Sequence, residues 1–539
     1  MTAAPTGFRP RSLFLLLALL ALAAYFKIDY HLSFAAEEPL ARAPYGDSVI
    51  YLEEAAARFG PEAPESSAFY KPPLYTFLLH LLAAHTEPGA ARVRLLQGGL
   101  GGLVLVLVFL MARSRGGDLA GAIAFACTLA YAPLTFHETK LLDTIPSLFL
   151  TVLACWLLDR MLRKGGGSQA ALITGIAFGL AALARSANLL LAVGGALLLL
   201  GPAGPRRALL LLLGAVLPVL PVSVWNTVAS GDLIPINYSE GHTFLVGNNP
   251  NAEGIYNLPA GYPDGVANER RVEFELARRA LGRDPTPGEQ RNHSYASGWR
   301  YLREHPSAAA ALYLKKLRFL TSSYPVHDNY SLERERRRFG WLGWAQLPFT
   351  LLLLAGVASL LLRPLRGEAV LVLPLVVTGL LLLIFYVTER YRLPMVPFLA
   401  IAAGAGVSAL LREPLHERAF RLRLLRSGVV LALLGAFVLS VPLPASRHAL
   451  AQSERTFDVI LDLHAANNLR EAGKYEAAAS ILARVVAAHP GDPSLEQHLL
   501  SLLHGRTPEE LTAIARAARE AAPLSPRVEA LLALAGARR

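Results

Sequence analysis

Three carboxylates lie close together near the start of the chain, in the stretch PYGDSVIYLEEAAARFG from Pro44 to Gly60. Asp47 falls at the start of an expected short helix, and Glu53 and Glu54 are expected on its solvated face. A carboxylate beside an acceptor hydroxyl can act as a general base, which is typically worth about 10²–10⁴-fold in rate. The spacing alone favours a simpler role: Asp47 caps the helix, because backbone N–H groups and the helix dipole stabilise an acid at that position.

A lysine follows in the stretch AFYKPPLYTFLLHLLAAH, where Lys71 precedes two prolines. The prolines suit the first turn of a helix, and Leu74, Phe77 and Leu81 then form an apolar stripe. The segment is too short to cross a bilayer comfortably, so we expect a helix that lies in the membrane surface and presents Lys71 at the depth of the headgroups. A single lysine at that depth is usually an anchor.

Two acids, Glu138 and Asp143, lie in the stretch TFHETKLLDTIPSLFL at the outer ends of two expected spans. Carboxylates at this depth are costly, so they tend to be paired or functional. A bridging divalent cation stays open as an alternative, although nothing in the spacing fixes a metal site. Asp143 also fits a cap of the helix that is expected to start at Thr144.

Two arginines, Arg390 and Arg392, lie in YVTERYRLPMVPFL, just before a span that starts with Pro394. Guanidinium groups at this boundary can bind a phosphate with several donors and stabilise it as a leaving group. Anchoring at the membrane interface explains the two arginines equally well from the sequence alone.

The elements that must position these residues follow from composition. The chain has 539 residues, of which 53% are hydrophobic and 17% are charged, whereas soluble domains carry about 25% charged residues. Apolar runs of roughly 18 residues or more predict bilayer-spanning helices, so we expect an all-α polytopic membrane protein. The net charge of +11 is attributed to cytoplasmic loops and not to nucleic-acid binding. Cys127 and Cys155 form no disulfide or metal pattern.

The apolar runs predict about eleven transmembrane helices, with short basic loops between them. Arg9 and Arg11 place the N-terminus in the cytoplasm, although the same start also resembles a signal peptide. The expected spans are 12–27, 94–112, 118–134, 144–159, 169–184, 187–201, 207–224, 342–362, 369–386, 394–411 and 427–443. This arrangement leaves exoplasmic loops at 28–93, 135–143 and 225–341 and an extracytoplasmic C-terminal domain.

The composition divides the chain into a membrane domain, residues 1–445, and a polar helical tail, residues 446–539. In the tail, the spacing of Leu469, Gly473, Tyr475 and Ala478 resembles one tetratricopeptide helix pair. One pair cannot bury both of its faces, so residues 493–536 are expected to add further helices. The tail either caps the membrane domain or docks a protein partner, and both interpretations stay open.

Six stretches, in this order, resemble the membrane glycosyltransferases of the protein-O-mannosyltransferase and lipid A aminoarabinose transferase type, which use polyprenyl-phosphate sugars. The stretches are GDSVIYLEEAAARFG, FYKPPLYTFLL, HETKLLDTIPSLFLTVLACWLL, GLAALARSANLLL, NTVASGDLIPINYSEGHTFLVGNNPNAEGIY and ERYRLPMVPFLAIAAGAGV. Each motif is short and degenerate, but together they cover most of residues 1–445. The tail lies outside this pattern.

The resemblance implies a role for individual residues. It implies Asp47 as the general base; Lys71, Arg390 and Arg392 at the donor phosphate; Glu138 and Asp143 as second-loop acids; and Arg185, Gly247, Asn248 and Asn249 facing substrate. Two departures are evident, because Ser48 stands where a second acid is common and Ser186 stands where proline is common.

The function expected from the resemblance is inverting transfer of a sugar from a polyprenyl-phosphate donor to an acceptor hydroxyl on a glycan, a lipid or a protein. The reaction would occur at the outer face of the cytoplasmic (inner) membrane, in the cell envelope, with no certain cofactor. A membrane transporter is a rival, but it would show ionisable residues within its spans and an inverted repeat, and the sequence shows neither. A catalytically inactive scaffold and a ligase for whole lipid-linked glycans remain as further alternatives.

Overall fold

The computed structural model describes residues 10–59, 67–201, 204–259, 266–362, 365–412, 418–440, 447–490 and 492–537. Arg9 and the expected domain boundary at 445/446 lie outside the described residues. Within the described residues, the regular structure is entirely helical, and the predicted all-helical membrane fold is confirmed.

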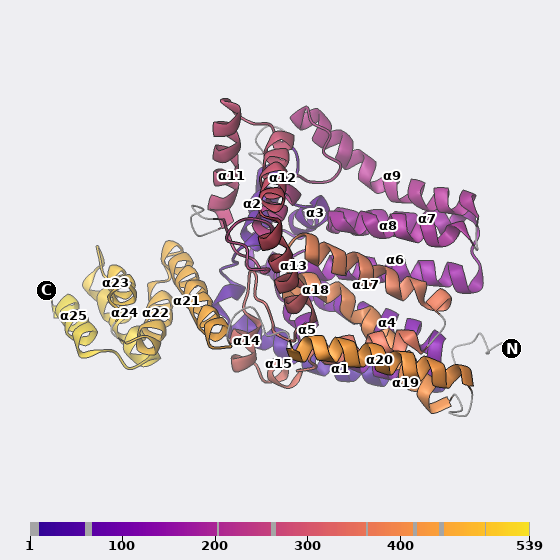
Figure 1. The fold of residues 1–539 in the computed structure, drawn as a ribbon. Coiled ribbons are helices and arrows are strands. Elements are labelled where there is room, and N and C mark those ends of the chain that lie inside the picture. The colour runs from indigo at the N-terminus through magenta and orange to yellow at the C-terminus, as the bar shows by residue number, and fades with distance from the viewer. Residues whose placement is uncertain are drawn as a thin grey trace. The chain divides into compact units, whose positions relative to one another are not determined.

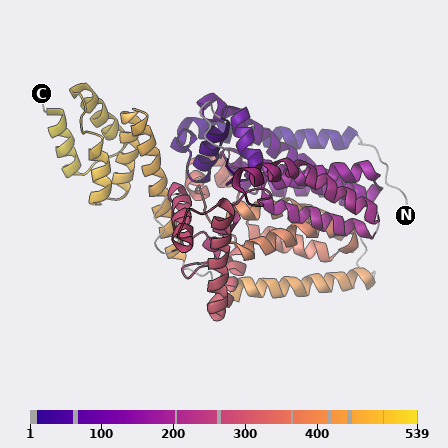
Figure 2. The ribbon, with the colours of Figure 1, turned by 90° about the horizontal axis from the view of Figure 1, so that it is seen from above.

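Within the described ranges, seven helical segments are long and apolar enough to cross a membrane. They contain α1 (Pro10–Glu37), α4 (Glu87–Leu129), α6 (Thr144–Lys164), α9 (Pro205–Ser230), α17 (Leu365–Ile384), α19 (Val396–Arg412) and α20 (Arg418–Ser440). Three shorter apolar helices join them, namely α7 (Ser168–Ala184), α8 (Leu189–Leu200) and α16 (Phe349–Leu361). Figures 1 and 2 show these helices running side by side.

The described part of each expected span overlaps one of these helices, and α4 overlaps two of the spans. The backbone of α4 leaves helical geometry at Gly116 and Gly117, where the φ of Gly117 is 74°, a conformation that glycine adopts without steric strain. The expected hairpin over 169–201 is also present: α7 and α8 are separated by the 3₁₀ turn η2 (Ser186–Asn188).

One expected span has the wrong start. The run 342–362 is divided into a short helix, α15 (Gly340–Trp344), and α16, which begins at Phe349. Pro348 stands immediately before α16, as its N-terminal cap. Proline has no backbone N–H and cannot continue an upstream helix, so a new helix starts after it.

Small residues let α7 and α9 approach closely. A Cβ atom on Gly175 would lie 2.0 Å from the carbonyl oxygen of Leu211, and one on Gly214 would lie 2.3 Å from that of Leu172. Without side chains at these two positions the backbones meet directly, as is common between helices in a membrane.

Shorter helices gather at one end of the apolar helices (Figure 1). They are α2 (Asp47–Phe59), α3 (Pro73–Leu81), α5 (Pro133–Glu138), α10 (Glu240–Gly247), α11 (Val266–Leu281), α12 (Pro287–Glu304), α13 (Pro306–Thr321) and α18 (Glu389–Arg392). We call this the loop end. Because α6 starts next to α5 and runs away from it, its last turn, which carries Arg163 and Lys164, lies at the other end.

That other end holds a buried ion-pair cluster. Arg115, at the break in α4, lies 2.6 Å from Asp159 on α6 and 2.7 Å from Glu368 on α17. Arg163 contacts the same two acids at 3.0 and 3.6 Å. The basic residues that were expected in short loops therefore also tie three helices together.

The tail belongs to a second compact unit, which contains Ser33–Gly46, Asn329–Arg334 and Ser446–Arg539. Its main helices are α21 (Arg447–Glu471), α22 (Tyr475–Ala488), α23 (Pro493–Ser501), α24 (Pro508–Ala521) and α25 (Pro526–Ala537). A helical pair is present where it was expected, and further helices follow it. The tetratricopeptide assignment itself stays a prediction.

The two loop segments in this unit were not foreseen from the sequence. Arg334 joins them to the tail, because its Nη2 lies 3.1 Å from Glu38 and 2.5 Å from Asp462. Gly473 closes the turn between α21 and α22 with a φ of 74°.

Candidate active site

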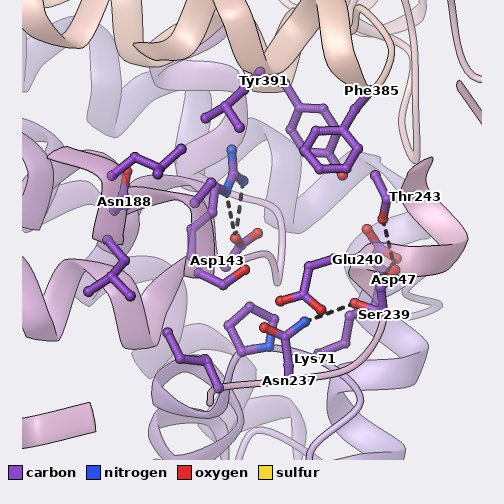
Figure 3. A pocket seen from close by; sticks show the side chains of 18 of the residues that line it. Asp47, Lys71, Asp143, Asn188, Asn237, Ser239, Glu240, Thr243, Phe385 and Tyr391 are labelled. Carbon is purple, nitrogen blue, oxygen red and sulfur yellow. Dashed lines mark hydrogen bonds and ion pairs between the residues drawn. The ribbon is translucent and has the colours of Figure 1, made fainter. Parts of the chain in front are cut away.

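A cavity of about 640 Å³ lies at the loop end, lined by residues of helices distant in sequence (Figure 3). It contains five of the predicted site residues, which are Asp47, Lys71, Asp143, Arg185 and Arg390. Its lining comes from α2, the segment just before α3, η2, α8, α10, α12, α17 and α18.

Asp47 is the first residue of α2, and two cations hold its carboxylate. Oδ1 accepts a hydrogen bond from Lys71 Nζ at 2.7 Å, and Oδ2 accepts one from Arg390 Nη2 at 2.8 Å. Burial by itself would raise the pKa of Asp47, but the charges of Lys71 and Arg390 outweigh it and hold the pKa well below its usual range. Asp47 is therefore an ion-paired cavity residue as well as the first residue of a helix.

Lys71 is positioned by Glu54, the third acid of the stretch from Pro44 to Gly60. Glu54 was expected on a solvated face, but it is buried, and this expectation was wrong. Its carboxylate accepts hydrogen bonds from the backbone N–H groups of Tyr70 at 2.8 Å and Lys71 at 3.3 Å. Glu54 thus ties the segment that carries Lys71 to the helix that begins with Asp47. Lys71 itself is largely buried in its ion pair and is not an exposed anchor.

Arg390 contacts three acids. Its Nη2 lies 2.8 Å from Asp47 and 2.8 Å from Asp328, and its Nη1 lies 3.9 Å from Asp143. The helix α18 that carries it begins at a Thr388 cap, whose side chain accepts a hydrogen bond from the Tyr391 N–H. The guanidinium therefore sits at the centre of a carboxylate cluster.

Asp328, which lies in the long loop 225–341, was not among the residues predicted for the site. Burial raises its pKa despite the nearby charge of Arg390, and the charge of Asp47 raises it further. No motif or helical spacing marks this acid, so only the fold brings it to Arg390.

Asp143 pairs with Arg185. Its Oδ2 accepts hydrogen bonds from Nε and Nη2 of Arg185 at 3.1 and 3.0 Å. Asp143 makes no side-chain cap to α6, so the cap interpretation was wrong. Arg185 occupies the break between α7 and η2, and its guanidinium lies 4.9 Å from the centre of the Tyr391 ring.

Glu138, the second acid predicted for this loop, is elsewhere. It is fully buried, lies 2.5 Å from Lys27 and 3.3 Å from His31 on α1, and does not line the cavity. The described residues contain no group of three or more metal-ligating side chains that could hold an ion. Because Glu138 and Asp143 have separate cationic partners, they do not fit the bridging cation that the sequence left open.

Arg392 does not line the cavity. It is buried, donates to the carbonyl oxygens of Phe319 at 3.3 Å and Ser322 at 2.5 Å, and stacks on the Phe349 ring at 4.2 Å. Its position corrects the expectation that both arginines meet a donor phosphate. Residues two apart on a helix point in different directions, so Arg390 faces the cavity and Arg392 faces the core.

Gly247, Asn248 and Asn249 do not line the cavity either, which corrects the expectation that they face substrate. Asn248 donates from Nδ2 to the carbonyl oxygens of Phe244 and Ile384, both at 2.8 Å, and accepts from Lys316 at 3.0 Å. These three residues close the C-terminal end of α10. The N-terminal turn of the same helix, with Ser239, Glu240 and Thr243, lines the cavity instead.

The two departures from the family pattern have different positions. Ser48 is fully buried and is not part of the cavity lining, whereas Ser186 is part of it. The second acid that is common in the family has therefore no counterpart here at the cavity surface.

Residues 70–225 match the family model described as Dolichyl-phosphate-mannose-protein mannosyltransferase. This match confirms the family resemblance. It extends from the segment before α3 into α9 and thus includes Lys71, Asp143 and Arg185, and it supports an enzyme of the glycosyltransferase type. No curated protein sequence matches the chain.

Two solved structures are similar to this chain at low sequence identity. One is ArnT from Cupriavidus metallidurans bound to undecaprenyl phosphate, with 14% identity, a TM-score of 0.41, and coverage of 97% of this chain and 77% of that one. The other is the archaeal oligosaccharyltransferase AglB from Archaeoglobus fulgidus in complex with an inhibitory peptide and a dolichol-phosphate, with 13% identity and a TM-score of 0.43. That match covers 91% of this chain but only 60% of AglB.

Proposed function

We propose that the chain is a glycosyltransferase that moves a sugar from a polyprenyl-phosphate donor to an acceptor hydroxyl, with Asp47 as the general base. The observation that carries this proposal is the contact of the Asp47 carboxylate with Lys71 and Arg390 inside a cavity at the loop end. The family match over residues 70–225 supports the same class of donor.

The cavity suits a molecule with a charged head and an apolar tail. Lys71, Arg185 and Arg390 supply the positive charge for a phosphate. Leucines from the start of α8 and the end of α17 supply an apolar part, namely Leu189, Leu190, Leu381 and Leu382. The outer surfaces of the same two helices are also apolar and exposed, as at Leu190 and Leu380, where a prenyl chain could lie against the protein within the bilayer.

The mechanism follows from the shared cations. While Lys71 and Arg390 hold Asp47, its carboxylate is a weak base. A donor phosphate would compete for both cations, which would raise the basicity of Asp47 at the moment when the sugar is in place. Asp47 would then accept the proton of the acceptor hydroxyl as that oxygen bonds to the anomeric carbon. The bond from this carbon to the phosphate oxygen breaks, and the phosphate leaves with the electron pair, stabilised by Lys71 and Arg390.

The geometry of such a displacement inverts the sugar carbon, because the hydroxyl attacks from the face opposite the phosphate. We place the loop end outside the cytoplasmic membrane and the N-terminus inside, because the short basic segments lie at the other end. A lipid-linked donor suits that side of the membrane. The acceptor is a hydroxyl of a glycan, a lipid or a protein, and the helical tail is a candidate docking surface for a protein partner.

The decisive experiment incubates the purified protein in lipid vesicles with a panel of radiolabelled prenyl-phosphate sugars, beside Asp47→Asn. We expect transfer by the wild type and a loss of about 10²–10⁴-fold in the variant, with binding of prenyl phosphate retained as evidence of folding. Undiminished transfer by the variant would remove Asp47 from its role. Solute uptake into the vesicles without any glycosyl product would favour the transporter instead.

A further inference from the structure

A second wall of the cavity is polar but mostly uncharged. It comes from the segment before α10, from α10 itself and from α12. Its members are Asn237, Ser239, Glu240, Thr243, Asn292 and Tyr295. Side-chain amides and hydroxyls that converge on a cavity are the groups that orient a polar ligand. Glu240 is the one acid in this set.

Glu240 is the first residue of α10, and its side chain extends into the cavity (Figure 3). Its Oε2 is shielded from solvent and has no hydrogen-bond partner within the described part of the chain. A buried polar atom without a partner is destabilising and therefore calls for an explanation. The side chain as a whole is only partly exposed, on the cavity that it lines.

The other two acids of the cavity lining are fully engaged. Asp47 is paired with Lys71 and Arg390, and Asp143 with Arg185. Glu240 forms no ion pair within the described ranges, although the charge of Arg291 acts on it. Burial raises the pKa of Glu240 to about 7, against smaller opposing effects of its own backbone, Ser186 and Arg291.

We propose that Glu240 is a sugar-recognition residue, which hydrogen-bonds ring hydroxyls of the sugar carried by the donor. This inference rests on the proposed function and names its substrate class: a neutral, hydroxylated sugar. The cavity already brings together the cations for the phosphate and this polar wall, so a sugar attached to that phosphate would lie between them.

One feature favours hydroxyls over an amino group as the partner of Glu240. A hydroxyl both donates and accepts, so it can pair with the carboxylate and with the protonated carboxyl group, whereas an ammonium pairs only with the carboxylate.

The test compares two binding equilibria in lipid vesicles: binding of the prenyl phosphate alone and binding of the same prenyl phosphate carrying its sugar. We expect Glu240→Ala to bind the prenyl phosphate like the wild type but to lose about 10-fold in affinity for the sugar-carrying donor. Glu240→Gln, which keeps the shape and the hydrogen-bonding atoms, should lose less. Glu253→Gln is the matched control, because Glu253 is an exposed acid of the same loop and does not line the cavity.

A donor that lacks one ring hydroxyl identifies the partner. The wild type should bind one such deoxy donor more weakly, and Glu240→Ala should not distinguish it from the complete donor. Equal affinity of Glu240→Ala and wild type for the complete donor would overturn the proposal. Equal losses of affinity for the prenyl phosphate and for the sugar-carrying donor would also overturn it, as would a change confined to the acceptor KM. A wild-type preference for an amino-sugar donor that Glu240→Gln abolishes would overturn it as well. Failure of the wild type to bind prenyl phosphate at all would instead contradict the proposed function.

Discussion

The Lys71 ammonium lies 2.7 Å from the Asp47 carboxylate. The proposed base and a proposed phosphate ligand are therefore partners in one ion pair, and Arg390 is the second partner of the same acid. A carboxylate held in this way resists protonation by water, and for the same reason it is a weak acceptor of the proton of a substrate hydroxyl. Under the proposed function, arrival of the donor phosphate removes that restraint, which predicts that donor binding precedes productive acceptor binding.

Lys71→Met should shift the acid limb of transfer activity to higher pH. The pKa of Asp47 is lowered in the folded protein, so its carboxylate stays charged at pH values where an ordinary aspartate would be protonated. The charge is lost only when the pH falls through this lowered pKa. Removing the Lys71 charge removes one cause of the lowering, so the pKa of Asp47 rises toward its ordinary value. The phosphate also loses a donor, and kcat should fall about 10²–10³-fold.

The measurement is a pH profile of kcat/KM for the radiolabelled transfer. Lys315→Met is the control, because Lys315 pairs with Glu253 and does not line the cavity. An acid limb at the same pH in Lys71→Met and wild type would show that Lys71 does not set the basicity of Asp47.

Arg115→Met should be strongly destabilising. The Arg115 side chain is 0% exposed and holds both Asp159 and Glu368, and removal of one member of a buried ion-pair cluster leaves the other charges uncompensated, at about 3–5 kcal/mol. Arg163→Met is the matched control, because Arg163 contacts the same acids but is 29% exposed. Unfolding in detergent, followed by helical circular dichroism, measures both. Equal losses in the two variants would contradict a decisive role for burial.

Gly247→Ala should reduce stability and leave the donor KM of the folded fraction unchanged. The added Cβ atom would lie 2.0 Å from the carbonyl oxygen of Phe385, so α10 and the end of α17 must separate, at about 1–3 kcal/mol. Gly99→Ala, at a helical position with open space around it, should be neutral or stabilising by about 0.5–1 kcal/mol. A raised donor KM at full stability would restore the substrate-facing role that the family resemblance implied.

Arg334→Met should loosen the second compact unit. Arg334 is buried between Glu38 and Asp462, and both acids lose their shared partner in the variant. Limited proteolysis should cleave the tail faster than in the wild type. Arg527→Met is the control, because Arg527 is exposed and its contact with Glu496 is 3.9 Å long. Unchanged cleavage in Arg334→Met would show that the tail is stable without this tie.

The sequence predicted the helices well because hydrocarbon leaves a chain few alternatives. A backbone in lipid must satisfy its own hydrogen bonds, so each long apolar run becomes helical. Individual helix ends were less predictable: the proline at position 348 delays the start of α16, α4 ends at Leu129, and α1 continues to Glu37. The ion pair of Asp47 and Lys71 is also consistent with the prediction that the segments carrying these two residues lie at the membrane surface, after the first span. Both acids of the second loop were recognised as significant.

Directions of side chains were less predictable. Arg390 and Arg392 form one motif in the sequence, yet a separation of two residues turns them to different sides of the helix. Glu138 and Asp143 likewise diverge to different partners, on α1 and at Arg185. Asp328 and Glu240 lie in the long stretch 225–341, and their positions depend on tertiary packing that no local pattern reveals.

The helix α8 has 12 residues, and at about 1.5 Å per residue it reaches roughly 18 Å, well short of the ~30 Å of hydrocarbon in a bilayer. The turn η2, from which α8 starts, contributes Ser186 and Asn188 to the cavity lining. The part of the cavity lined by Ser186 and Asn188 would therefore lie below the membrane surface, at the depth of the lipid acyl chains. Under the proposed function, a polyprenyl chain could enter the cavity from the side with its apolar portion still in the bilayer, and only the sugar and the reacting phosphate would need to meet water.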